Sequence, residues 1–107
     1  MAFDASNNLH FTDDRDKTIH KLGSDGVIHT VTTIANSPYG IDFDGSGNLH
    51  ISIFNTSSFW TIDRLSGSDL VRVAGNGNEG INGDGGPGVD AEFLGASHFA
   101  FDSAGNL

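Results

Sequence analysis

The sequence predicts an all-β fold, and three features lead to that prediction. Fifteen glycines stand against two prolines in 107 residues, and short apolar runs alternate with clusters of Asn, Asp, Ser and Gly. Such clusters form tight turns between strands. No window has the apolar spacing of a long amphipathic helix, and none reaches the roughly 18 consecutive apolar residues of a membrane span. In addition, one short segment occurs three times along the chain.

The recurring segment defines a repeat. Residues 2–10 (AFDASNNLH) reappear as residues 42–50 (DFDGSGNLH) and, as far as the leucine, as residues 100–107 (AFDSAGNL). The phenylalanines lie at Phe3, Phe43 and Phe101, so the two intervals are 40 and 58 residues. The additional residues of the second interval fall in the Gly-rich stretch 75–88, which we predict to be an inserted loop.

Each repeat unit is expected to contain four antiparallel strands. The first strand is represented by residues 41–43 and leads into an Asp-x-x-Gly-Asn type turn, whose small polar residues tolerate positive φ. The second strands are expected at residues 9–12 and 49–54, the third at 18–22 and 60–65, and the fourth at 27–34 and 70–74. Four such strands in a unit of roughly 40 to 50 residues form one blade of a β-propeller.

The chain resembles the NHL-repeat family. Residues 11–22 (FTDDRDKTIHKL) are similar to the family's V-A-D-x-x-N-x-R-I-x-K segment, and residues 73–77 (VAGNG) with 83–87 (GDGGP) are similar to its V-A-G-x-G…G-D-G-G-P linker. Residues 52–60 (SIFNTSSFW) depart from the pattern, as does Asp16, where Asn is usual. The resemblance implies a propeller with blade one at about 1–36, blade two at about 37–75, the insert at about 75–90 and the start of the next blade at about 96–107.

The number of blades predicts self-association. A propeller closes with typically four to eight blades, whereas this chain supplies two and the start of a third. The six-bladed ring usual in the family would need three copies, so we expect a homotrimer. In that ring residues 99–107 and 2–9 would occupy the same place, so one segment is displaced, the ring closes by strand exchange, or the chain is a piece of a larger protein. Ends at Met1 and Leu107, both inside strands, favour a fragment or an engineered chain.

The formal charge of −9, from 14 acidic and 5 basic side chains, limits the partners of the chain. Phosphate backbones and anionic membranes would be repelled, so we expect neither nucleic acid nor a membrane as a partner. RNA binding, which some NHL domains show, requires a basic face that five Lys and Arg residues do not supply. The absence of cysteine excludes disulfides, thiolate zinc sites and a cysteine nucleophile, and it leaves the compartment open.

Two motifs resemble ligand sites, and turns explain both better. Residues 75–80 (GNGNEG) fit the G-x-G-x-x-G pattern of dinucleotide sites, but residues 81–86 (INGDGG) cannot begin the helix that such a site needs. Residues 42–47 (DFDGSG) match half of a calcium loop, although Ile53 stands where that loop needs Glu. Asn82, Asp84 and Asp90 in the insert are alternative calcium ligands. We predict no cofactor, with calcium or zinc as the alternative.

The five histidines raise the question of a zinc site, because imidazole is a common zinc ligand. His10 and His50 occupy the same repeat position, so we expect both to lie on equivalent second strands for packing or solvent reasons. Propeller lyases of the amidating-lyase kind gather histidines at the ring centre, and this resemblance makes His98 the metal candidate, since three copies of it would complete a site. Ser97 beside His98 is not expected to act as a nucleophile, because neighbours along a strand point to opposite faces.

The function that the sequence favours is a non-enzymatic scaffold or interaction module, and no catalytic residue is assigned. Its complete ring would present loops and a central channel to a protein, a peptide or a small ligand. The alternative is a fragment of a propeller enzyme, similar to lyases or lactonases, that holds calcium or zinc in the channel. Both functions are inferred from the fold by analogy with other propellers. Stoichiometric metal in the purified protein would favour the enzyme.

Overall fold

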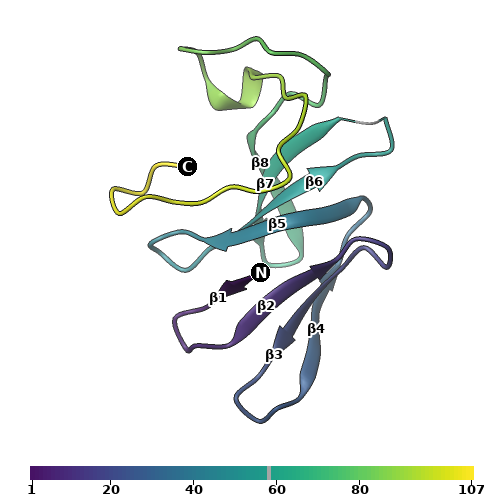
Figure 1. The fold of residues 1–107 in the computed structure, drawn as a ribbon, viewed down its shortest axis with the longest axis vertical. Coiled ribbons are helices and arrows are strands. Elements are labelled where there is room, and N and C mark those ends of the chain that lie inside the picture. Colours follow the sequence, from purple (N-terminus) through teal and green to yellow (C-terminus); the bar gives the residue numbers. More distant parts are fainter. Residues whose placement is uncertain (58) are drawn as a thin grey trace.

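The computed structural model describes residues 1–57 and 59–107 and forms two four-stranded antiparallel sheets (Figure 1). The first sheet holds β1 (Ala2–Phe3), β2 (Leu9–Asp13), β3 (Thr18–Leu22) and β4 (Ile28–Thr33). The second holds β5 (Ser37–Phe43), β6 (Leu49–Phe54), β7 (Trp60–Ser66) and β8 (Asp69–Ala74). The predicted all-β class is confirmed. Ser58, within the departing stretch 52–60, lies outside the described residues.

The strands of the two sheets lie where the repeat predicts them, apart from the first strand of the second unit. Met1 and Leu107, which were expected inside strands, lie outside the strands of the described residues. The first strand of the second unit, β5, begins at Ser37 instead of residue 41, because Ser37 and Pro38 pair with Phe54 and Ile53 beyond an irregularity in the ladder. The register of β2 and β3 repeats in β6 and β7, since Thr12 lies opposite Ile19 and Ser52 lies opposite Ile62. The two sheets are therefore built on one plan.

The Asp-x-x-Gly-Asn type turn repeats in atomic detail. Asp44 Oδ1 accepts hydrogen bonds from the backbone N–H groups of Ser46 and Asn48, both at 2.9 Å, and Asp44 Oδ2 accepts one from Asn48 Nδ2 at 2.9 Å. Gly47 has a φ of 84°, a left-handed conformation that glycine adopts without strain. The turns at Asp4 and Asp102 contain the same bonds to Asn8 and Asn106. The local sequence alone thus determines this turn.

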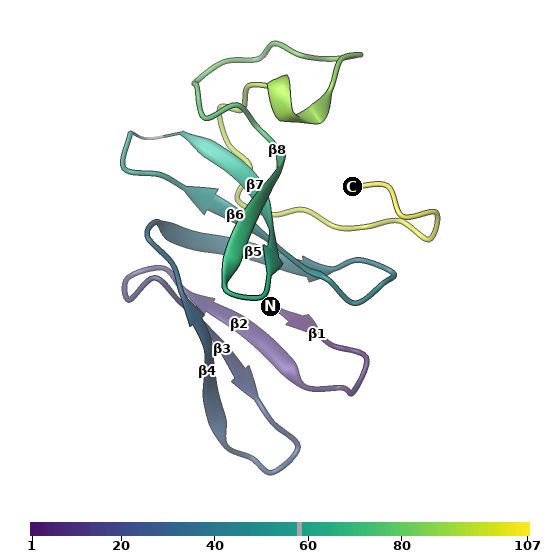
Figure 2. The same ribbon diagram turned by 180° about the vertical axis from the view of Figure 1, so that it is seen from behind.

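The core lies between the two sheets. Ile19 of β3 and Ile51 of β6 are completely buried, and Ile41, Leu49 and Ile53 join them from the second sheet. Because side chains alternate along a strand, Leu49, Ile51 and Ile53 share the face of β6 that is turned toward the first sheet. β5 lies next to β1 and β2, which places the sheets side by side as adjacent layers (Figures 1 and 2).

Residues 75–107 form no strand among the described residues. The insert contains one 3₁₀ turn, η1 (Gly88–Asp90), and its two arms are joined by backbone bonds from Gly75 N to Gly88 O and from Asn76 N to Ala91 O. The segment expected to start the next blade runs beside β5, on the side away from the first sheet (Figure 1). It forms the Asp102 turn without joining either sheet. No helix among the described residues is long and apolar enough to cross a membrane.

Candidate functional site

One hydroxyl contact occurs twice, at equivalent places. Thr12 Oγ1 of β2 donates a hydrogen bond to the backbone oxygen of Tyr39 at 2.7 Å, which joins the first sheet to β5. Ser52 Oγ of β6 donates one to the backbone oxygen of Ser97 at 3.0 Å, which joins the second sheet to the C-terminal segment. Thr12 and Ser52 stand 40 residues apart, the same interval as the first repeat. The C-terminal segment therefore takes the place that β5 takes one unit earlier.

The two repeat histidines make the same contact twice. The ring of His10 meets the ring of Phe43 edge-on, with the centroids 5.0 Å apart, and the ring of His50 meets that of Phe101 in the same way at 4.7 Å. Both imidazoles are buried, and each Nδ1 lies near the backbone oxygen of the asparagine two residues before it. The expectation that His10 and His50 lie on equivalent second strands is confirmed, and both serve packing.

Gly40 allows the C-terminal segment to approach β5 closely. A Cβ atom at this position would lie 2.6 Å from the backbone oxygen of Ser97 and 2.9 Å from the Cα of His98. The backbone N–H of Gly40 donates to Ser52 Oγ at 2.8 Å, so the Ser52 hydroxyl is free to donate onward to Ser97. Asp42 Oδ2 accepts a bond from the backbone N–H of Phe101 at 3.2 Å, which fixes the segment at a second point.

His98, the predicted metal candidate, lies exposed at the edge of an open cavity of 350 Å³. The cavity lies where β1, β2 and β5 meet, and its other lining residues are Met1, Phe11, Thr12, Asp14, Pro38 and Tyr39. His98 Nδ1 is 3.2 Å from Ser97 Oγ. Within residues 1–57 and 59–107, no group of three or more His, Asp and Glu side chains is placed to hold a metal ion. The zinc site at His98 stays a prediction about an assembly.

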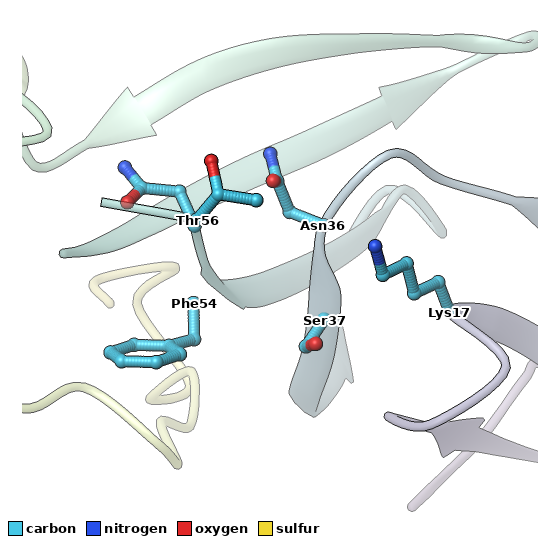
Figure 3. A pocket seen from close by; sticks show the side chains of 6 residues that line it. Lys17, Asn36, Ser37, Phe54 and Thr56 are labelled. Carbon is cyan, nitrogen blue, oxygen red and sulfur yellow. The ribbon is translucent and has the colours of Figure 1, made fainter. Parts of the chain in front are cut away.

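A second cavity, of 220 Å³, opens at the rim where the two sheets adjoin (Figure 3). The polar ends of Lys17, Asn36 and Thr56 surround it, and the ring of Phe54 forms part of its wall. Lys17 and Asn36 come from the first unit and Thr56 comes from the second, so these side chains surround one cavity only when the two sheets pack, and the repeat pattern does not mark them.

The third cavity, of 560 Å³, is largely apolar and lies on the face of the second sheet turned away from the first. Ile62 is part of its wall, together with Ala74, Phe93, Phe99 and Leu107. Ile62 is the repeat equivalent of Ile19, which the second sheet covers completely. Phe54 and Trp60 lie on the same side as Ile62 and are only half-buried, with their ring centroids 5.1 Å apart. This face repeats the surface on which the second sheet itself packs.

The carboxylates of the DFDGSG stretch, which resembles half of a calcium loop, already have hydrogen-bond partners. Asp42 and Asp44 accept hydrogen bonds within the contacts and turns described above, which agrees with the interpretation of DFDGSG as a turn. In the insert, Asn82 Nδ2 donates to Glu92 Oε2 at 2.7 Å, while Asp84 and Asp90 are exposed. Sequence reasoning missed Glu92, because its partner stands ten residues earlier and no repeat marks it.

The pKa values of the turn carboxyls are shifted in the same direction in all three repeats. The side-chain amide of the following asparagine, and then its backbone N–H, lower the pKa of Asp4, Asp44 and Asp102 below the ordinary value. The physical cause is that both donors stabilise the charged carboxylate. The turns are therefore held best when these groups are ionised.

Comparison of the chain with protein-family models, with curated proteins and with solved structures found no significant match.

Proposed function

We propose that this chain is a β-propeller scaffold of the NHL type that forms a six-bladed ring from three copies and serves as an interaction module. The observation that carries the proposal is the repeated contact. Residues 97–101 pack on the second sheet through equivalents of the bonds and rings by which β5 packs on the first. A contact that repeats with the same geometry at each unit builds a ring when the rotation from unit to unit closes.

The free face of the first sheet supports the same proposal. Strand alternation turns Leu9, Phe11 and Leu22 away from the second sheet. Their repeat equivalents Leu49, Ile51 and Leu65 face the first sheet and belong to, or pack against, the core between the sheets. A second copy can therefore place the outer face of its second sheet against Phe11, in a head-to-tail contact that forms a ring when the rotation closes.

The charge indicates the class of partner. A chain with a formal charge of −9 becomes a ring three times as acidic, which attracts cationic partners and repels nucleic acid. The loops at the rim and the central channel are the surfaces that ring closure leaves open to such a partner. The chain thus acts by presenting surfaces, with no bond made or broken in this proposal.

Light scattering behind a size-exclusion column, over a range of concentrations, tests the assembly. We expect a particle of three times 11.2 kDa at high concentration, and a thermal midpoint that rises with concentration because folding and assembly are linked by mass action. A single-chain mass at every concentration, with a constant midpoint, would contradict the ring.

A matched pair of variants locates the contact. Phe11→Asp places a charge on the free face of the first sheet and should prevent assembly, because an unpaired buried charge is costly. Ser24→Asp adds the same charge in an exposed turn and should assemble normally. Equal assembly by both variants would show that the free face of the first sheet takes no part.

A further inference from the structure

The edge of β2 is only partly paired. β1 pairs with it through Ala2 opposite His10 and Phe3 opposite Leu9, whereas β5 pairs with β6 at five positions. The part of β2 from Phe11 to Asp13 has no ladder partner on that edge among the described residues. An open strand edge of this kind is a template for another strand.

The C-terminal segment contains the matching sequence and is itself unpaired. Residues 100–102 (AFD) repeat residues 2–4, and the Asp102 turn copies the Asp4 turn in its hydrogen bonds. Residues 96–99 precede this match and are the repeat equivalents of residues 38–41 in β5. By the register of β5 on β6, Phe99 would lie opposite Phe11 and Ala96 opposite Asp13. The segment therefore offers more ladder positions than β1 does.

The C-terminal segment is already held in an ordered position on the second sheet. The Ser52 and Asp42 bonds hold it against the second sheet at the position of the next inner strand, and its turn is formed. A second copy that docks its first sheet there brings the open edge of β2 alongside an ordered strand, so little further ordering entropy has to be lost.

We propose that residues 96–106 of one copy displace β1 and its turn in the next copy and pair with that copy's β2. The partner is a second copy of this chain, and the inference rests on the proposed ring. Of the two duplicated segments, the C-terminal one then pairs with β2 of the next copy, and the N-terminal one is released from it.

Matched proline substitutions test the exchange in full-length protein. Asp4 N donates to Asn8 O, and antiparallel ladders alternate, so the N–H of residue 2 faces β2 and the N–H of residue 100 would do the same after exchange. Proline removes that donor. We expect Ala100→Pro to raise the concentration needed for assembly roughly tenfold, and Ala2→Pro to lower that concentration, because β1 then leaves β2 more easily. The reverse result would overturn the exchange while leaving the ring intact.

A cross-link provides a second readout that does not depend on stability. The protein has no native cysteine, so chains carrying Ala100→Cys can be mixed with chains carrying His10→Cys and oxidised. Directly opposed residues on antiparallel strands lie close enough for a disulfide. We expect covalent dimers of the two chains, and none when Ser24→Cys replaces His10→Cys. A trimer without this cross-link would overturn the exchange, and a monomer at every concentration would overturn both proposals.

Discussion

The two sheets share one topology but bury their residues very differently. β6 is buried at every position except its last, whereas in β2 only His10 is buried. Phe11 and Ile51 occupy the same repeat position, yet Ile51 is 0% exposed and Phe11 is half-buried. The reason is that Ile51 faces the first sheet, while Phe11 faces away from the second. Burial in this fold is therefore a property of the neighbouring unit, and a mutation should have its full effect only where a neighbour is present.

The largest difference in the free energy of unfolding is expected between the alanine variants of Ile51 and Phe11. Ile51→Ala leaves a cavity in the core and should lower the free energy of unfolding by about 2 to 5 kcal/mol. Phe11→Ala should cost clearly less at low protein concentration, where the copies are apart, and more when they assemble. Urea titrations at two concentrations measure both effects. Equal losses at low concentration would mean that the two sheets are equally covered.

The next largest loss of stability is expected for a substitution at Gly40, because an added Cβ atom would meet the backbone of the C-terminal segment. Gly40→Ala places that atom 2.6 Å from the Ser97 oxygen and should displace the C-terminal segment, at a cost of about 1 to 3 kcal/mol. Gly45→Ala is the matched control, since no atom lies within 4 Å of the added Cβ. Limited proteolysis should cut residues 96–107 faster in the first variant only. Equal rates would contradict the close approach.

The stability losses on removing the Ser52 and Thr12 hydroxyl contacts should differ by a smaller amount. Ser52→Ala leaves the buried Gly40 N–H without its acceptor and should cost about 1 to 3 kcal/mol. Thr12→Val removes only the bond to the Tyr39 oxygen, at a site that is half-buried, and should cost about 0.5 to 1.5 kcal/mol. Thermal unfolding of both variants at one low concentration ranks them. A larger loss for Thr12→Val would reverse the ranking of the two contacts.

The smallest effect expected is the acid dependence of the turns. The folded pKa of Asp44 lies below its unfolded value, so its contribution to stability is present above the unfolded pKa of about 4 and is lost as the pH falls through the folded pKa. Asp44→Asn should reduce the loss of stability between neutral pH and acid. Asp102→Asn should change it less, because the Asp102 turn belongs to no sheet. Thermal midpoints across the acid range would contradict this order if both variants behaved alike.

Most of the local structure could be predicted from particular residues. The Asp and Asn of each repeat form the turn by bonds within a few residues, and Asn7 or a glycine takes the positive-φ position between them. The turn therefore appears even at Asp102, which belongs to no sheet. The strands of both sheets followed from the repeat. The main difference, the early start of β5 at Ser37, depends on pairing with Phe54, a residue seventeen positions away that the local pattern cannot reveal.

The candidate site could be predicted only in part. The equivalence of His10 and His50 predicted that both lie on equivalent second strands, because repetition is visible in the sequence. Gly40 and Ser52 were not singled out, since their importance comes from the approach of Ser97, 45 residues beyond Ser52. The 40-residue interval between Thr12 and Ser52, both hydroxyl residues, was the available signal.

The sequence by itself determined the turns, the strand periods and the number of repeat units, because these depend on interactions within one unit. Only the tertiary structure decided which faces are covered, where Gly40 must have no side chain, and where the C-terminal segment lies. Those features arise when units 40 or more residues apart come into contact, and the free energy of that contact depends on shape and distance that residue order alone does not contain.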